Sequence, residues 1–285
     1  MVSANEGEAP DSFGQLIDWA STRLASSSSS PRLDAELLVA SVAGIRRSAV
    51  LAYPERRLGG SRRERFTELV QRRLSGVPLA YLTGTREFFS LELVIRAGVL
   101  VPRPETELLV EQALAQIGTE RSVEILDLGT GCGAIALALK DARPLAEIAA
   151  VDLSATALAV ARENGERLGL AVSWLESDWF AAVAGRSFDL IVANPPYVAS
   201  GDPLLAGDLR HEPALALDGG EDGLAAIRAI VAGARAHMKP GGRLLVEHGY
   251  DQGPAVLALA RGAGFADAET LKDLAGHDRA LDAVA

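Results

Sequence analysis

The chain has 285 residues, 48% of them hydrophobic and 23% charged, which is the composition of a globular protein that can bury a large core. No stretch is apolar for long enough to span a bilayer, and the acidic N-terminus does not resemble a signal peptide, so we expect a cytoplasmic protein with no membrane partner. The single cysteine, Cys132, excludes an internal disulfide and a cysteine-based zinc site. The four histidines have no metal-ligand spacing, so no metal site is predicted, and the net charge of −10 argues against general nucleic-acid binding.

Helical spacing dominates the first part of the chain. Apolar residues recur three and four positions apart over residues 13–20 and again over residues 33–42. Pro31 and Pro54 interrupt this pattern and separate one helix from the next. A small helical bundle is therefore predicted for residues 1–86.

Arginines are concentrated in this predicted bundle. Nine of them lie within a short stretch, namely Arg46, Arg47, Arg56, Arg57, Arg62, Arg63, Arg65, Arg72 and Arg73. Only Glu55, Glu64 and Glu68 oppose them there. The plain interpretation is a solvated helical face, and the alternative is a docking surface for an acidic or RNA-associated partner.

The pattern then changes to alternation, which is typical of strands. Phe89, Leu91, Leu93 and Ile95 alternate with polar residues, and Ala97-Gly98 supplies turn residues. We therefore expect a β-hairpin connector over residues 87–103. Residues 102–107, with two prolines and two glutamates, are expected to open a helix that runs to Gln116.

Strands and helices alternate over the remainder of the chain. The predicted strands are residues 123–128, 148–151, 172–175, 188–193 and 243–247. The predicted helices are residues 134–142, 155–168, 224–238 and 254–262. Such alternation predicts an α/β domain over residues 104–285, in which a parallel sheet carries helices on both faces.

A glycine-rich stretch closes the first of these strands and opens a helix. It reads Asp-Leu-Gly-Thr-Gly-Cys-Gly-Ala over residues 127–134, and its glycines permit a tight turn that a ligand can approach closely. Asp152 ends the next strand about 20 residues on, where its carboxylate can accept hydrogen bonds from both hydroxyls of a ribose. After the third strand, Trp179 offers a flat surface for an adenine ring. The loop alone is ambiguous, because residues 131–136 also satisfy the dinucleotide fingerprint.

The stretch Asn194-Pro195-Pro196-Tyr197 follows the fourth predicted strand. Its two prolines stop the strand and fix the backbone, so that an amide, a carbonyl and an aromatic ring are presented together. In open α/β sheets, ligands bind at this edge. Asn194 offers a donor and an acceptor, which suits an enzyme acting on a planar, amide-like nitrogen.

Together these motifs resemble class I amino methyltransferases that use S-adenosylmethionine (SAM). The chain is further similar to the PrmC/HemK family, which methylates N5 of the glutamine in the GGQ motif of peptide-chain release factors. The similarity covers nearly the whole chain and extends to residues 81–84, 98–111, 212–217, 247–252 and 273–279. His277 and Cys132 stand where the family often has arginine and serine or threonine, respectively.

The resemblance implies a Rossmann-like, mostly parallel seven-stranded sheet, a substrate-docking role for the helical domain, and SAM as donor with S-adenosylhomocysteine as product. It implies that SAM is bound by Gly129, Thr130, Gly131, Cys132, Gly133, Asp152, Trp179 and Asn194. It implies that the substrate glutamine is bound by Asn194, Pro195, Pro196 and Tyr197, of which Asn194, Pro195 and Tyr197 are catalytic. Release factors are the implied partners, with no direct nucleic acid required. Glu247 is interpreted as structural, and Asp127 either contacts the SAM amino group or caps the glycine turn.

Three alternatives stay open. An adenine N6-methyltransferase would present a similar planar NH2 to the same motif, but it calls for a basic cleft and a target-recognition domain. A ribosomal-protein glutamine methyltransferase shares Asn-Pro-Pro-Tyr, although the family that modifies ribosomal proteins usually differs around residues 102–107. A non-catalytic SAM-binding module would have little use for an intact Asn194-Pro195-Pro196-Tyr197.

Overall fold

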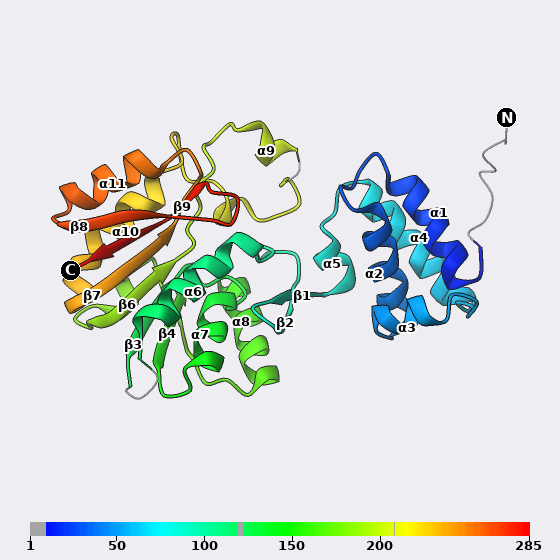
Figure 1. Cartoon of the computed structure of the whole chain (residues 1–285), viewed down its shortest axis with the longest axis horizontal. Helices are drawn as coiled ribbons and strands as arrows, with labels where there is room; N and C mark the ends of the chain where they lie inside the picture. The colour runs from blue at the N-terminus through cyan, green and yellow to red at the C-terminus, as the bar shows by residue number, and fades with distance from the viewer. Residues whose placement is uncertain (1–9, 119–121, 208) are drawn as a thin grey trace. The chain divides into compact units, whose positions relative to one another are not determined.

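The computed structural model describes residues 10–118, 122–207 and 209–285. The chain divides into two compact units, one ending at Gly84 and the other beginning at Thr85 (Figure 1). This division falls two residues before the expected end of the helical region. Among the described residues, no helix is both long enough and apolar enough to cross a membrane.

The first unit is a bundle of helices around its own core. Its helices are α1 (Phe13–Leu24), α2 (Pro31–Ala43), α3 (Arg47–Ala52), α4 (Gly60–Leu74) and α5 (Leu79–Thr83). Pro31 occupies the first turn of α2, where its missing N–H costs nothing, and Gly44 ends that helix in the left-handed conformation. Leu16 and Leu38 are fully buried with Phe66, so the apolar spacing in the sequence does mark the face that packs inward.

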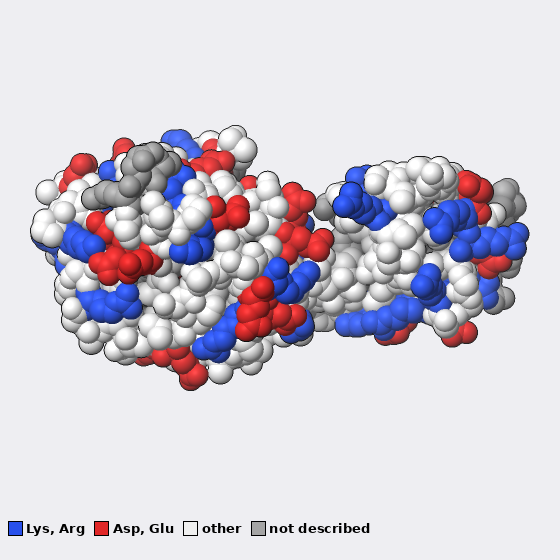
Figure 2. Space-filling view, turned by 90° about the horizontal axis from the view of Figure 1, so that it is seen from below, with Lys and Arg blue, Asp and Glu red and all other residues white. Residues whose placement is uncertain are grey.

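Ion pairs hold most of the arginines of this unit. Arg73 on α4 lies 2.7 Å from the buried Asp34 on α2, and Arg47 lies 2.7 Å from the buried Glu36. The other paired members of the predicted arginine cluster are Arg57, Arg63, Arg65 and Arg72. Figure 2 shows acidic side chains among the basic ones on the visible face of this unit. The cluster is therefore partly internal scaffolding, and not all of it is free surface.

The second unit opens with a two-stranded hairpin, β1 (Thr85–Phe88) and β2 (Leu91–Val94). Its turn is formed by Phe89 and Ser90, which both have positive φ, at 48° and 65°. The expectation that Ala97-Gly98 makes the hairpin turn is wrong, because those residues form a separate turn after β2. Two consecutive positive φ angles usually require Asn or Gly, so Phe-Ser carried no turn signal. The Phe89 amide donates to Glu107 Oε1 over 3.0 Å, which helps to hold the turn.

The main sheet has seven strands in the order β5-β4-β3-β6-β7-β9-β8. The strands are β3 (Glu124–Leu128), β4 (Glu147–Asp152), β5 (Ser173–Glu176), β6 (Phe188–Ala193), β7 (Met238–Glu247), β8 (Asp267–Lys272) and β9 (Asp278–Val284). The first five are parallel, and β9 runs antiparallel to both β7 and β8. The predicted Rossmann-like, mostly parallel sheet is confirmed. Its order reverses between β3 and β6, which places a ligand crevice at their carboxyl ends.

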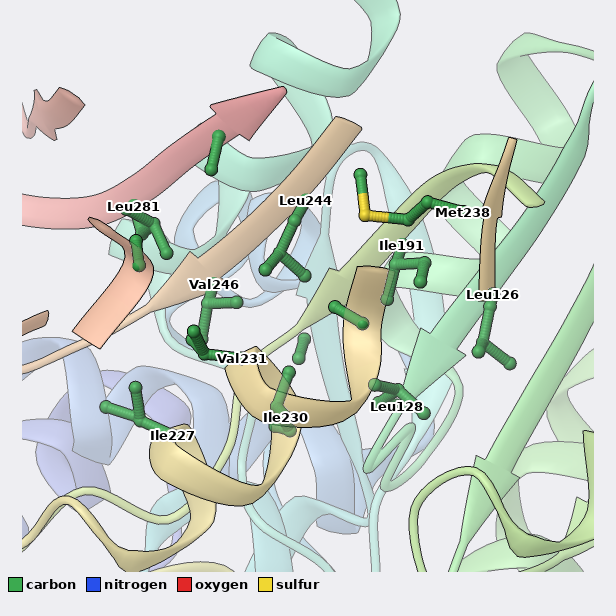
Figure 3. Packing of buried hydrophobic residues seen from close by; sticks show 14 of the residues in the cluster. Leu126, Leu128, Ile191, Ile227, Ile230, Val231, Met238, Leu244, Val246 and Leu281 are labelled. Carbon is green, nitrogen blue, oxygen red and sulfur yellow. The ribbon is translucent and has the colours of Figure 1, made fainter. Parts of the chain in front are cut away.

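Helices cover both faces of this sheet (Figure 1). They are α6 (Glu107–Gln116), α7 (Ala134–Ala142), α8 (Ala155–Leu168), α10 (Ala225–Ala234) and α11 (Gly253–Gly262). The short α9 (Pro203–Ala206) lies in the loop between β6 and α10 and covers neither face. Within the described ranges, short 3-10 helices accompany them at Pro104–Thr106, Ala181–Val183, Ala214–Ala216 and Arg235–His237. Figure 3 shows side chains of β3, β6 and β7 meeting those of α10 in one buried layer. This packing fixes the strand ends that carry the polar motifs.

Candidate active site

A cavity of about 400 Å³ lies in the second unit, at the carboxyl ends of the parallel strands. This volume lies within the range of pockets that bind small molecules. Its lining includes these residues of the predicted site: Gly129, Thr130, Gly131, Cys132, Asp152, Trp179, Asn194 and Pro196. Gly133, Pro195 and Tyr197 are not among the lining residues. Residues 98–100, from the segment after the hairpin, and residues 215–216 contribute further wall.

The glycine loop passes from β3 to α7 with three positive φ angles, at Gly129 (70°), Gly131 (58°) and Gly133 (86°). A Cβ on Gly129 would lie 3.7 Å from the ring of Trp179, so the glycine keeps the backbone close to that ring. A Cβ on Gly133 would lie 2.9 Å from the ring of Trp174. Gly133 therefore permits α7 to pack against its neighbours, whereas Gly129 and Gly131 face the cavity.

Asp152 anchors the loop from the end of β4. Its Oδ2 accepts the Gly131 amide over 2.8 Å, and its Oδ1 accepts the Ser154 amide over 2.8 Å. Burial raises the pKa of this carboxyl group, while the backbone donors to it act in the opposite direction. Because a carboxylate oxygen has two lone pairs, each oxygen retains one that can accept from a ribose hydroxyl at the cavity wall.

Asp127 lies fully buried at the end of β3. Its Oδ2 accepts the Thr130 hydroxyl over 2.6 Å and the Ala136 amide over 3.2 Å, so this carboxyl group does cap the glycine turn. Its Oδ1 is buried without a hydrogen-bond partner among the described residues. Burial raises the pKa of Asp127 to about 7. An unpartnered buried oxygen behind the loop fits a ligand that brings a cationic amino group.

Trp179 lies after β5 in a strained conformation, with φ at 45°. Its carbonyl oxygen accepts the Ser177 hydroxyl over 2.9 Å, and the same hydroxyl oxygen accepts the Ala182 amide over 2.9 Å. These bonds hold a half-buried indole at the cavity wall, where a flat heterocycle can stack on it. Asp178 lines the cavity beside it and is exposed.

Asn194 is the first residue after β6, and its side chain is tied to the start of α6. Its Nδ2 donates to Thr106 Oγ1 over 3.0 Å. Pro195 is buried and Pro196 half-buried behind it. The Tyr197 hydroxyl donates to Glu247 Oε1 over 3.0 Å, and burial raises the pKa of this phenol above its ordinary value. The tyrosine therefore remains a neutral donor at physiological pH.

Two residues at the site were missed or undervalued from sequence. Thr106 is buried on the cavity wall and was not singled out, and Glu247, at the end of β7, was interpreted as structural. The Thr106 hydroxyl donates to Glu247 Oε2 over 2.7 Å, which joins both residues to Asn194 and Tyr197. A signal did exist for Glu247, because it is a charged residue that ends a buried strand at the ligand-binding edge.

Glu212 joins two walls of the cavity. Its carboxylate accepts the Val101 amide over 2.9 Å and pairs with Arg103, so residues 98–103 and the segment around Pro213 are fixed to each other. Glu212 is buried although it is charged, which is tolerable only because both partners are present. The cavity is thereby shaped by contacts that lie outside the sheet.

Two family models match the chain. The PrmC N-terminal domain matches residues 15–84, and the methyltransferase small domain matches residues 104–208. Among solved structures, the 16S rRNA N2 G1207 methyltransferase of Thermus thermophilus, solved with AdoMet and guanosine, is 25% identical with a TM-score of 0.53. The aligned part is 70% of this chain and 49% of that chain. A methyltransferase of Pyrococcus furiosus, 17% identical with a TM-score of 0.53, shares the fold over 69% of this chain and 89% of its own.

Curated relatives match over most of their length. A release factor glutamine methyltransferase of Salmonella typhimurium is 48% identical over 88% of this chain and 91% of its own. A relative of the same name from Burkholderia pseudomallei is 50% identical over 87% of this chain and 90% of its own. One from Escherichia coli is 46% identical over 88% of this chain and 91% of its own. The chain therefore belongs to the family of release factor glutamine methyltransferases and is a SAM-dependent methyltransferase.

Proposed function

We propose that the chain transfers the methyl group of SAM to N5 of the glutamine in the GGQ motif of peptide-chain release factors. The observation that carries the proposal is the position of Asn194. Its amide lies on the wall of the same cavity as the glycine loop and Asp152, so a donor methyl group and an acceptor amide can meet there. The names and identities of the curated relatives support the choice of acceptor.

The residues present fit SAM. Asp152 would hold the ribose hydroxyls, Trp179 would stack near the adenine, and the loop from Gly129 to Cys132 would pass beneath the methionine part. The unpartnered Asp127 Oδ1 lies behind that loop and matches the positive charge of the SAM amino group. SAM supplies a sulfonium that already activates the methyl group for displacement.

The difficult partner in this reaction is the nucleophile. An amide nitrogen has its lone pair delocalised into the carbonyl, so it attacks poorly while it stays planar. Acceptors at Asn194 Oδ1 and the Pro195 carbonyl would orient the NH2 group, favour pyramidalisation and stabilise the developing positive charge. Tyr197 would pack against the amide plane and Pro196 would complete the substrate site. The proton is proposed to leave late, to water.

The partner and the compartment belong to the same proposal. Release factors are the proposed protein substrates, docked in part by the helical unit over residues 1–86. No direct nucleic acid and no membrane are required for this reaction. The cytoplasm is the proposed compartment because translation factors act there. The connector over residues 87–103 and the methyltransferase domain over residues 104–285 complete the proposed division of the chain.

One assay tests the proposal. The protein is incubated with methyl-labelled SAM and one of four acceptors: a release factor, that factor with its GGQ glutamine changed to alanine, a ribosomal-protein substrate, or DNA. Label is expected on the intact release factor alone. Label on the alanine variant would place the methyl group elsewhere, and label on DNA or the ribosomal protein would favour one of the alternatives. Absence of label on every acceptor would contradict an enzymatic role on these substrates.

A further inference from the structure

A hydrogen-bond chain runs behind the proposed acceptor site. It passes from Asn194 through Thr106 to Glu247 and ends at Tyr197, with donor-to-acceptor distances of 3.0, 2.7 and 3.0 Å. Thr106 is 4% exposed and Glu247 only 1%, so water does not compete for these bonds. The four residues come from distant parts of the sequence, and the bond between Thr106 and Glu247 spans 141 positions. Because these residues are far apart in the sequence, their contacts depend on the tertiary fold and not on local structure.

The chain of bonds has one direction. The hydroxyls of Thr106 and Tyr197 both donate to the Glu247 carboxylate, which in its ionised form can only accept. Once its hydrogen is committed in this way, Thr106 Oγ1 can only accept from Asn194. The Asn194 amide must then turn its NH2 toward Thr106 and leave Oδ1 on the other side. No described group donates to Oδ1, and Asn194 lines the cavity.

The alternative orientation would defeat the reaction. If the Asn194 amide were flipped, its NH2 would face the NH2 of the substrate glutamine, and two donors would oppose each other at the reacting atom. The flipped form is disfavoured because Oδ1 would then lie against an oxygen with no hydrogen left to offer. Glu247 therefore acts on the substrate site through Thr106 without touching the substrate.

We infer that Thr106 and Glu247 are positioning residues that fix the amide of Asn194 as a hydrogen-bond acceptor and hold the ring of Tyr197 by its hydroxyl. This inference rests on the proposed function, because it concerns the same acceptor site. Burial raises the pKa of Glu247, and the two hydroxyl donors together with Arg279 oppose that effect. The arrangement also couples the start of α6 to the ends of β6 and β7.

A double-mutant cycle between Thr106 and Asn194 tests the inference. Thr106→Val keeps the shape but removes the hydroxyl, so it is expected to lower kcat by about 100-fold through misorientation of Asn194, with no change in the Kd of SAM. In an Asn194→Ala background the same substitution should cause no further loss, because the amide on which it acts is gone. Thr106→Ser restores the hydroxyl and should bring kcat closer to the wild-type value than to that of the valine variant.

Asp282→Asn is the matched control. Asp282 is a second buried carboxylate, 4% exposed, on the neighbouring strand β9, where it pairs with Arg243 at 2.7 Å. Its replacement should lower the melting temperature and leave kcat intact, whereas Glu247→Gln should lower kcat as well. If Thr106→Val fails to fold, the cycle is run with Glu247→Gln and Asn194→Ala.

Each outcome has one meaning. Additive losses in the cycle, or equal kcat values for the serine and valine variants, overturn the positioning role while methylation by the wild type still stands. A drop in kcat for Asp282→Asn equal to that for Glu247→Gln also overturns it, since general loss of stability would then suffice. Failure of the wild type to methylate any release factor contradicts the proposed function itself.

Discussion

Three short polar side chains at neighbouring strand ends divide the chemistry of the cavity. Asp127 on β3 caps the glycine turn, Asp152 on β4 is the proposed acceptor for a ribose, and Asn194 after β6 is the proposed acceptor for the substrate amide. Each follows a buried apolar run, so its backbone is held by the sheet and only its side chain reaches the ligand. This arrangement preorganises the site, because little has to move when a ligand binds.

Removal of the Asn194 side chain separates catalysis from cofactor binding. Asn194→Ala is expected to lower kcat for release-factor methylation by about 100-fold or more, because a single preorganised hydrogen-bonding group can contribute that much. The Kd of SAM, measured by calorimetry, should change little. If SAM binding fell as steeply as turnover, Asn194 would hold the cofactor and not the acceptor amide.

Asp127 should make stability depend on pH. Its folded pKa is about 7 and its ordinary value is 3.8, so between these values the folded state keeps a proton that the unfolded state releases. The free energy of unfolding should therefore fall as pH rises through this window, by roughly 4 kcal/mol at most. Asp127→Asn removes this titration. Urea denaturation without SAM should show that the free energy of unfolding of the variant, relative to that of the wild type, is higher at pH 8 than at pH 5.

The control for this titration is Asp178→Asn, which removes an exposed carboxyl group beside the same cavity. Its stability relative to the wild type should be similar at the two pH values. A constant gap between Asp127→Asn and the wild type would mean that Asp127 has the same pKa in both states.

Sequence could identify the residues that end predicted strands but not the residues that support them. Asp152 and Asn194 follow apolar runs at the ligand-binding edge, so their positions were predictable. The contact between Thr106 and Glu247 depends on how α6 meets β7 in three dimensions. No periodicity or spacing records such a contact, and an isolated threonine carries no signal of its own.

At the scale of elements, the glycine loop serves two purposes. Gly129 and Gly131 open the cavity wall, whereas Gly133 lets α7 approach Trp174 and Ala161. The sequence pattern predicted a single ligand-binding role for Gly129, Gly131 and Gly133. It could not separate them, because the difference lies in which neighbours a Cβ would meet.

A pair of alanine substitutions distinguishes these purposes. Gly131→Ala places a Cβ in open space at φ 58°, so only backbone strain of about 1–2 kcal/mol is expected. Gly133→Ala adds a clash at 2.9 Å with the Trp174 ring, so a further 1–3 kcal/mol of destabilisation is expected. Chemical denaturation measures both. Equal losses would show that the packing around Gly133 relaxes freely.

The terminal hairpin of the sheet escaped prediction. β8 (Asp267–Lys272) has no run of buried residues, because it lies at the edge of the sheet and half of its residues are exposed. β9 contains charged Asp282 within its buried stretch, because Arg243 on β7 neutralises it across the strands. A charged residue inside a strand suggests a loop when its ion-pair partner is unknown. The turn of the β1–β2 hairpin was misplaced because Phe89-Ser90 likewise lacks the residues typical of a turn.

At the scale of the whole molecule, each unit has a core of its own. The helical unit joins its helices not only by apolar packing but also by buried ion pairs such as Arg73 with Asp34. Among the described residues, no ion pair is found for Arg46, Arg56 or Arg62 of the arginine cluster. These three are the candidates for contact with an acidic surface of a protein substrate.

Replacement of these three arginines by alanine tests the docking role. The KM for the release factor is expected to rise about tenfold at low salt, with less change at high salt, because screening weakens such contacts. The Kd of SAM should stay constant. A control with the same change in net charge replaces three exposed arginines of the second unit, Arg162, Arg186 and Arg261. An equal rise in both variants would return the cluster to ordinary surface.

Cys132 gives this protein a built-in reporter. It is the one thiol of the chain, it is 2% exposed within the glycine loop, and burial raises its pKa to about 12. Alkylating reagents need a thiolate that they can reach, so the folded protein should react slowly and the opened loop quickly. The rate of labelling by iodoacetamide therefore measures how often the loop opens, without an engineered cysteine. Ligands that close over the loop would register as slower labelling, which makes the cysteine a gauge of cofactor occupancy.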